Sequence, residues 1–302
     1  MYFCAINQNE STLLYKQVNP KLRPYIYFWM NRWAYLINLF FVKRMDVTGL
    51  ENIPKDKPLI LAGTHANSFY DAIVLHLLIK GRHVHALARG DAFNKGWVSK
   101  VLDMVYIIPV WRITEGKSNM QKNEYTFQKC HQLLKENKVV LIYPEGVCKN
   151  QTTLLPIKRS GITRLASDAW AAGIDAHIVP IVSNYDSFKK FGKRINLSVA
   201  PALTRENYDI SDQKALGQKL VNDLTAAMEP MINHEFKPVS FFRNPFYYIG
   251  WVINFPLYFI INKIAKAKFG RTVFFDSVFY GFMYVSMAFY WIILATILSF
   301  IF

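Results

Sequence analysis

Short apolar runs alternate with amphipathic stretches through the middle of this 302-residue chain. Five runs have the length and the polar borders of buried strands: residues 59–63, 83–88, 105–111, 139–143 and 177–182. Apolar positions recur at helical spacing over residues 119–136 and 162–172. This alternation predicts an α/β fold, a single domain with a mostly parallel central sheet flanked by helices.

The two ends of the chain are more apolar than its middle. Residues 25–42 are interrupted by Asn31, Arg32 and Asn38, which argues against a membrane span and predicts a helix lying in the membrane interface, with Trp29 and Trp33 at headgroup depth. A buried helix packed on the core is the alternative.

The C-terminal end carries the best candidate for a membrane span. After Asp276, residues 277–302 contain no charge, and a helix of that length, at about 1.5 Å per residue, would cross a hydrocarbon core of about 30 Å. Residues 244–262 are apolar too, but Asn254 and Pro256 lie near their middle. We expect residues 244–262 to dip into one leaflet and only residues 277–302 to cross.

The basic connector between these segments predicts an orientation. It carries Lys263, Lys266, Lys268 and Arg271, which the positive-inside tendency keeps on the cytoplasmic side. The expected organisation is a membrane-interface segment over residues 1–45, a catalytic domain over 46–240 on the cytoplasmic face of the membrane (the inner or cell membrane in a bacterium), and a membrane segment over 241–302.

The net charge and the cysteine content limit which classes of binding partner the chain can have. The net charge of +15 favours acidic partners, and the apolar ends make anionic membrane lipids a better fit than nucleic acid. The three cysteines form neither a disulfide framework nor a zinc-ligand spacing. Residues 1–17 are polar and mixed, so no secretory signal is expected there.

The segment Gly63-Thr64-His65-Ala66-Asn67-Ser68-Phe69-Tyr70-Asp71 follows a predicted strand and opens a helical run. Residues six apart on one helix point about 120° away from each other, so His65 and Asp71 can meet only if His65 lies in the turn before the helix. A carboxylate beside an imidazole fixes its tautomer for general-base work. The alternative is a packing or capping histidine with an aspartate that complements the helix dipole.

Three further blocks follow in order. Residues 105–112 form a buried run that ends in Arg112, Tyr143-Pro144-Glu145-Gly146 ends another, and residues 177–182 (His-Ile-Val-Pro-Ile-Val) form a third. With the His–Asp segment first, these blocks resemble the four motifs of the glycerolipid acyltransferase family. The lead-in at residues 47–54 and the stretch 86–89 are similar to that family as well. The resemblance covers about residues 46–200.

The resemblance implies roles for individual residues. His65 would be the general base and Asp71 its orienting partner. Arg112, Glu145 and Gly146 would bind the glycerol-phosphate group, and Lys158 and Arg159 would contact a phosphate or the acyl carrier.

The resemblance also implies a reaction. An acyl group would pass from acyl-CoA or acyl carrier protein to a hydroxyl of glycerol-3-phosphate or of its 1-acyl derivative, in phospholipid biosynthesis. No metal and no bound cofactor is implied.

Two departures from the family pattern leave alternatives open. Five residues separate His65 from Asp71 where the family usually has four, a spacing that resembles fungal-type glycerol-3-phosphate and dihydroxyacetone-phosphate acyltransferases. The basic segment at 156–161 is one residue longer than usual. An O-acyltransferase for an aminolipid or another lysolipid would show the same blocks, and a catalytically inactive membrane-anchored lipid-binding protein is the alternative of another class.

His83 and His85 alternate on a predicted strand, so both side chains point to one face. Neither has an acidic or cysteine partner at ligand spacing. We interpret both as packing residues, and His131, which falls in a predicted helix, in the same way.

Overall fold

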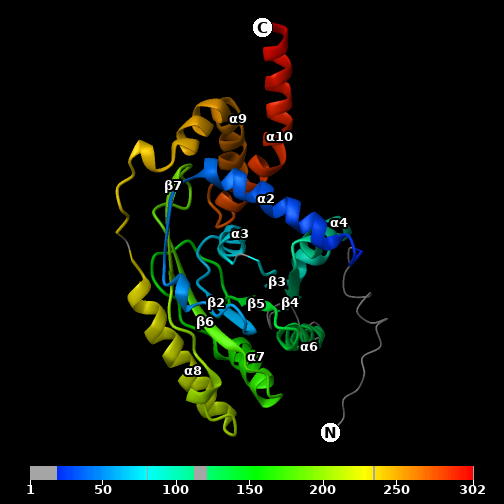
Figure 1. The fold of residues 1–302 in the computed structure, drawn as a ribbon, viewed down its shortest axis with the longest axis vertical. Coiled ribbons are helices and arrows are strands. Elements are labelled where there is room, and N and C mark those ends of the chain that lie inside the picture. Colours follow the sequence, from blue (N-terminus) through cyan, green and yellow to red (C-terminus); the bar gives the residue numbers. More distant parts are fainter. Residues whose placement is uncertain (1–18, 80, 112–120, 234, 302) are drawn as a thin grey trace.

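The computed structural model describes residues 19–79, 81–111, 121–233 and 235–301. Seven strands form one sheet in the order β1-β7-β6-β2-β5-β3-β4 (Figure 1). Their bounds are β1 Val42–Thr48, β2 Leu59–Gly63, β3 Val84–Arg89, β4 Ile107–Val110, β5 Val139–Ile142, β6 His177–Tyr185 and β7 Lys193–Val199. Strands β2 to β6 are mutually parallel, whereas β7 pairs antiparallel with β6 and parallel with β1. The predicted fold class is therefore confirmed.

The central strands are those that the apolar runs predicted. Every residue of β2 and of β5 is buried, as expected for strands covered on both faces. Strands β1 and β7 extend the sheet beyond the predicted set. Charged and polar residues interrupt the apolar residues of both strands, and β7 alternates buried with half-buried positions, so neither forms a continuous apolar run.

Helices cover both faces of the sheet (Figure 1). One hydrophobic cluster joins β2, β5 and β6 to α6 (Lys122–Lys135), α7 (Arg159–Ala171) and α8 (Gln213–Met228). The cluster on the opposite face joins the sheet to α3 (Phe69–Leu78), α4 (Gly96–Met104) and the terminal helices α2 (Arg23–Phe41), α9 (Pro245–Phe269) and α10 (Phe275–Ile301). The architecture is a three-layer α/β/α arrangement.

Helix α2 is apolar on both its sides. Its inner side buries Ile37 and Phe41, whereas Tyr25 and Trp29 are 71% and 70% exposed. Trp33 packs inward, where its Nε1 donates to the Tyr284 carbonyl at 2.7 Å. The inner side of α2 therefore follows the core-packing alternative, and contact of its outer side with a membrane interface stays a prediction.

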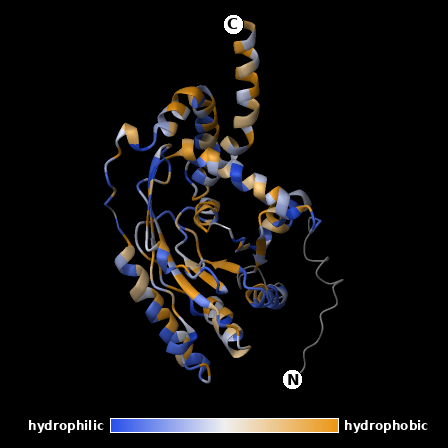
Figure 2. Ribbon diagram, in the orientation of Figure 1, coloured by the Kyte–Doolittle hydropathy of each residue, from blue (hydrophilic) through white to orange (hydrophobic). Residues whose placement is uncertain are grey.

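Helices α9 and α10 cover the two predicted C-terminal segments, and their placement in a membrane stays a prediction. Helix α9 continues through Pro256 to Phe269, so the basic residues 263–268 lie on its last turns and not in a separate connector. Helix α10 extends away from the body of the molecule, with apolar residues along its length (Figures 1 and 2). Among the described residues, Phe275–Ile301 is the one helix that is long and apolar enough to cross a membrane.

Candidate active site

The loop between β2 and α3 brings His65 and Asp71 together. His65 lies two residues after β2, and α3 begins at Phe69, so Asp71 is in the first turn of the helix. The Nδ1 of His65 lies 3.0 Å from Oδ2 of Asp71. This is the geometry that the six-residue separation required, with the imidazole in the turn before the helix.

Asp71 is fully buried and both of its oxygens accept hydrogen bonds. The backbone N–H of Asn67 donates to Oδ2 at 2.7 Å, and the hydroxyl of Tyr185, at the end of β6, donates to Oδ1 at 2.7 Å. Donors fixed on two elements hold the carboxylate in one orientation. Burial, followed by the adjacent Asp71 carboxylate, raises the pKa of Tyr185, so this hydroxyl remains a donor.

The His65 ring is held on one face and partly open to solvent. It stacks on the ring of Tyr143, with centroids 4.0 Å apart and planes 12° apart. Its side chain is 19% exposed. Nδ1 faces Asp71, and in the described part of the chain Nε2 has no hydrogen-bond partner. The arrangement leaves Nε2 as the ring nitrogen that can accept a proton from a bound molecule.

Glu145 supports the same loop from the neighbouring strand. The residue is 1% exposed, and its Oε2 accepts from the His65 N–H at 2.8 Å while Oε1 accepts from the Leu155 N–H at 3.0 Å. Burial raises the pKa of Glu145, and the two backbone donors oppose that rise. In this structure the carboxylate ties the loop after β5 to the backbone of His65.

Gly146 makes the turn that brings Lys158 to this edge. Its φ of +67° is one that L side chains rarely adopt, and a Cβ there would lie 2.9 Å from Cδ of Lys158. The Lys158 side chain therefore lies over Gly146, and the backbone N–H of Lys158 donates to the Pro144 carbonyl at 2.8 Å. A cation over the Glu145-Gly146 turn could contact an anionic group bound there.

Arg159 and Arg112 are not placed in the site. Atoms Cγ and Cδ of Arg159 lie against Gly217 of α8, whereas the Lys158 side chain lies over Gly146. The two side chains therefore lie in different places, and the geometry does not support a site role for Arg159. Arg112 lies outside the described residues, and its role stays a prediction.

A polar hollow adjoins the loops after β2 and β5. It is lined by side chains that are mostly hydroxyls and amides: Thr64, Glu145, Gln151, Thr152, Thr153, Ser183, Asn184, Tyr185 and Asn233, together with Ala66 and Ile232. Among the described residues, none forms a hydrogen bond with the buried Ser183 hydroxyl or with Oε1 of Gln151. The hollow could hold a polar group within reach of this edge of the sheet.

Several residues of this network were not predicted from the sequence. Tyr185 lies 114 residues after Asp71, and the contact has no local sequence signal. Asn67, inside the predicted motif, donates its side-chain N–H to Asp276 at the start of α10, and Lys193 of β7 forms an ion pair with Asp276. A lysine at the start of a strand and an aspartate before an apolar run have ordinary surface roles in most sequences.

His83, directly before β3, and His85 in β3 pack as the sequence suggested. His83 stacks on Tyr106 with ring centroids 4.5 Å apart, and Nδ1 of His85 lies 3.2 Å from the Val139 carbonyl. Burial lowers the pKa of both, to about 3 for His85. These rings belong to the core beside α2 and α4.

Comparison with known proteins gives a consistent picture. Residues 44–184 match the family model described as Acyltransferase. A 1-acyl-sn-glycerol-3-phosphate acyltransferase of Bacillus subtilis is 29% identical over 119 residues, 39% of this chain and 55% of the relative. A chloroplastic 1-acyl-sn-glycerol-3-phosphate acyltransferase of Arabidopsis thaliana is 25% identical over 192 residues, 60% of this chain and 50% of the relative. The chain thus spans about half the length of these curated relatives.

A solved structure is similar as well. The 1-acyl-sn-glycerophosphate acyltransferase PlsC of Thermotoga maritima aligns with a TM-score of 0.49 at 15% identity, over 72% of this chain and 84% of that one.

Proposed function

Because residues 44–184 match the family model described as Acyltransferase and the chain is similar to 1-acyl-sn-glycerol-3-phosphate acyltransferases, we propose that this protein is a glycerolipid acyltransferase that acylates a glycerolipid precursor. The acyl group comes from an acyl thioester, acyl-CoA or acyl carrier protein. The acceptor is a hydroxyl of glycerol-3-phosphate or 1-acyl-glycerol-3-phosphate. The observation that carries the proposal is the contact between Nδ1 of His65 and the buried Asp71 carboxylate, at the edge of the sheet where parallel strands end.

His65 acts as the general base. Asp71 accepts a hydrogen bond from the Nδ1–H of His65, which leaves Nε2 free to take the proton of the acceptor hydroxyl as its oxygen attacks the thioester carbonyl. The tetrahedral intermediate then collapses, the carbon–sulfur bond breaks, and the proton passes from His65 to the departing thiolate. The products are an ester and a free thiol, and the imidazole is neutral again.

The remaining candidate residues hold the site or the acceptor. Glu145 fixes the backbone of His65, and Lys158 supplies positive charge above the Glu145-Gly146 turn. Arg112, directly after the Val110-Trp111 end of the second motif block, suits bidentate binding of a phosphate.

The terminal helices hold the site at a membrane surface. Large apolar side chains are exposed on α2, α9 and α10, and such a surface is stable in contact with lipid. The basic residues at the end of α9 would meet anionic headgroups, at roughly 1 kcal/mol each near the surface. An active site at the membrane surface would leave its lipid product in the membrane, where that product has to remain.

The experiment is acyl transfer by His65→Ala, with His131→Ala on α6 as the matched control. Loss of a general base is expected to lower kcat by about 10³-fold, with unchanged expression and membrane association. The control keeps wild-type turnover. Undiminished turnover in His65→Ala would overturn the proposed base.

A further inference from the structure

The first turn of α10 contacts the catalytic loop directly. Oδ2 of Asp276 accepts from the side-chain N–H of Asn67 at 2.8 Å. The hydroxyl of Ser277 donates to the Asn67 carbonyl at 3.1 Å and accepts from the Tyr70 N–H at 3.1 Å. Two consecutive residues of the most apolar helix are thus bonded to the loop between His65 and Asp71.

Helix α3 takes part of its N-terminal cap from α10. The residue before α3, Ser68, makes no capping hydrogen bond with its side chain. The Ser277 hydroxyl binds the N–H of Tyr70 in the first turn, as a local capping side chain would do. The start of the helix that carries Asp71 is therefore held in part by the Ser277 hydroxyl, more than 200 residues away in the sequence.

The backbone of this loop is strained at the same place. Ser68 has φ 52° and ψ −135°, a conformation that favours glycine. Ser277 binds the backbone on both sides of it, at Asn67 and Tyr70, and the Cys148 Sγ accepts from the Ser68 N–H at 3.2 Å. Strained residues persist where the surroundings fix them, and α10 supplies part of that constraint.

Asp276 is itself held by a buried cation. Lys193 is fully buried and forms an ion pair with Asp276, which is 2% exposed. The Lys193 ammonium also lies over the rings of Phe41 and Tyr70, 5.0 and 5.4 Å from their centroids. A buried pair of this kind is costly to bring out of water and contributes orientation more than stability.

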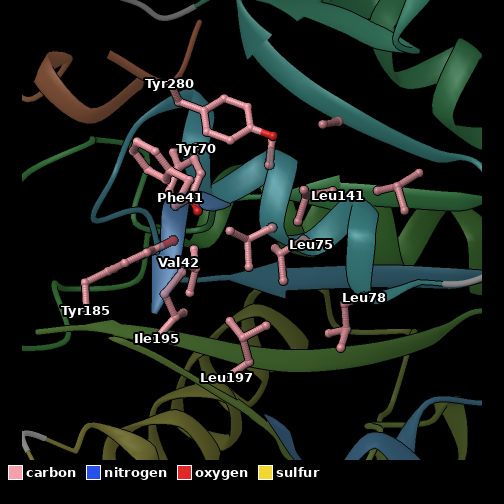
Figure 3. Close-up of a cluster of buried hydrophobic side chains, with 14 of the residues drawn as sticks. Phe41, Val42, Tyr70, Leu75, Leu78, Leu141, Tyr185, Ile195, Leu197 and Tyr280 are labelled. Atoms are coloured by element: carbon pink, nitrogen blue, oxygen red, sulfur yellow. The ribbon is translucent and has the colours of Figure 1, made fainter. Parts of the chain in front are cut away.

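Aromatic packing fixes the same end of α10 against the body. Tyr280 lies beside Tyr70 and Phe41, with ring centroids 5.1 and 5.2 Å away (Figure 3). The Tyr280 hydroxyl donates to the Ala34 carbonyl of α2 at 2.8 Å. The first two turns of α10 are therefore part of the protein core, and the remainder leaves it.

One residue completes the connection to the proposed base. The Asn67 side chain binds Asp276, and the Asn67 backbone N–H binds Oδ2 of Asp71, the oxygen that contacts His65. A shift of Asn67 would move a donor of the Asp71 carboxylate directly.

We propose that Asp276 and Ser277 are positioning residues for the His65–Asp71 pair, so that α10 sets the geometry of the active site besides anchoring the chain. This inference rests on the proposed function for its kinetic consequence. It extends that function to a helix outside the matched family region, which ends at residue 184.

The test compares Ser277→Ala with Ser286→Ala in the full-length protein. Ser286 lies on the same helix, and its hydroxyl donates to the Phe282 carbonyl of that helix. Loss of the cap is expected to lower kcat about tenfold with little change in KM for either substrate, because a misplaced catalytic group affects the reacting step more than binding. Ser277→Thr, which keeps a hydroxyl, restores most of the turnover.

Hydrogen exchange gives a second readout that does not need activity. Peptides covering residues 65–72 should exchange faster in Ser277→Ala than in Ser286→Ala or the wild type, because the Tyr70 N–H loses one of its two acceptors and the Asn67 carbonyl loses the Ser277 donor. Faster exchange together with a lower kcat supports the proposal. Equal exchange in the two variants overturns it, and so does faster exchange with an unchanged kcat. If the wild type acylates no acceptor, the proposed function fails, and hydrogen exchange still decides whether α10 holds the loop.

Asp276→Asn probes the other contact. The amide keeps one acceptor for Asn67 but loses the charge that pairs with Lys193, so we expect a kcat lower than that of Ser286→Ala and a KM close to the wild-type value. A kcat equal to that of Ser286→Ala would remove Asp276 from the proposal.

Discussion

The sheet with α6, α7 and α8 is stabilised differently from the terminal helices α2, α9 and α10. In the first region apolar faces point inward, as in the cluster of Ile60, Val140 and Leu165. In the second, apolar side chains also point outward, and inward contacts include polar ones: Trp291 Nε1 donates to Asn254 Oδ1 at 2.8 Å, and Trp33 Nε1 donates to the Tyr284 carbonyl. Figure 2 shows apolar residues along α10 where it leaves the body.

This difference follows from the solvent that each region meets. Burial of apolar surface drives packing in water, whereas helices in lipid gain little from it and associate through close packing and hydrogen bonds. The proposed active site lies where the two regions join. Asp71 receives donors from the sheet, through Tyr185, and from a loop that α10 holds.

The largest effect on activity is expected at the Asp71 carboxylate, because both regions hold it. In the wild type both oxygens of Asp71 accept hydrogen bonds. In Asp71→Asn the NH₂ group replaces one of these acceptors, and it then faces either the Tyr185 hydroxyl or the Asn67 N–H and the His65 ring. We predict a fall in kcat on the order of 10³-fold, because the wrong imidazole tautomer is favoured. Steady-state acyl transfer measures it; a loss under tenfold would contradict the assigned role.

The next effect concerns the ion pair that joins β7 to α10. Lys193→Met leaves the buried Asp276 without its counter-charge, and we predict a loss of about 3 kcal/mol in the free energy of unfolding. The double variant Lys193→Met, Asp276→Asn should regain part of this loss, since no buried charge remains. Thermal or denaturant unfolding in detergent measures both, and equal stability of Lys193→Met and the wild type would contradict a buried pair.

A smaller effect separates the inward and outward faces of the terminal helices. Trp291→Phe removes the donor to Asn254, a residue that is 1% exposed, and leaves Oδ1 unpaired at a cost of about 1–3 kcal/mol. Trp251→Phe on α9 is the control, because Trp251 is 42% exposed. Its unfolding should match the wild type. Equal losses in both variants would show that the two faces do not differ.

The smallest effect is a pH dependence in the core beside β3. Burial lowers the pKa of His85 to about 3, whereas the unfolded chain binds a proton near 6.5. As pH falls from about 6.5 towards 3, the unfolded state takes up that proton and the folded state does not, so stability falls by up to about 1.4 kcal/mol per pH unit. His85→Gln should lose less stability between pH 6.5 and 5 than the wild type; equal slopes would contradict a neutral buried ring.

Much of the sheet and the His65–Asp71 contact follow from sequence patterns. Strand β2 and its neighbours are continuous apolar runs, and the turn before α3 was the one geometry that allowed His65 to meet Asp71. Strands β1 and β7 were missed because charged positions such as Lys43 and Arg194 interrupt their apolar pattern.

The parts of the site that the sequence did not predict are long-range contacts. Tyr185 reaches Asp71 only because β6 lies beside β2 in the sheet, and Asp276 reaches Asn67 only because α10 packs on α3. Neither residue type carries a spacing that indicates its partner. The division of the chain at residues 45 and 240 stays a prediction, and so do the roles assigned to Arg112 and Arg159.

Acyl transfer by the purified full-length protein in vesicles tests the central claim most directly. Glycerol-3-phosphate, 1-acyl-glycerol-3-phosphate and a lysoaminolipid are each supplied with acyl-CoA and with acyl carrier protein, and both free thiol and acylated product are measured. The account predicts one thiol released for each ester formed with glycerol-3-phosphate or its 1-acyl derivative. Ester formation on the lysoaminolipid alone, or no ester with any pair, would contradict it.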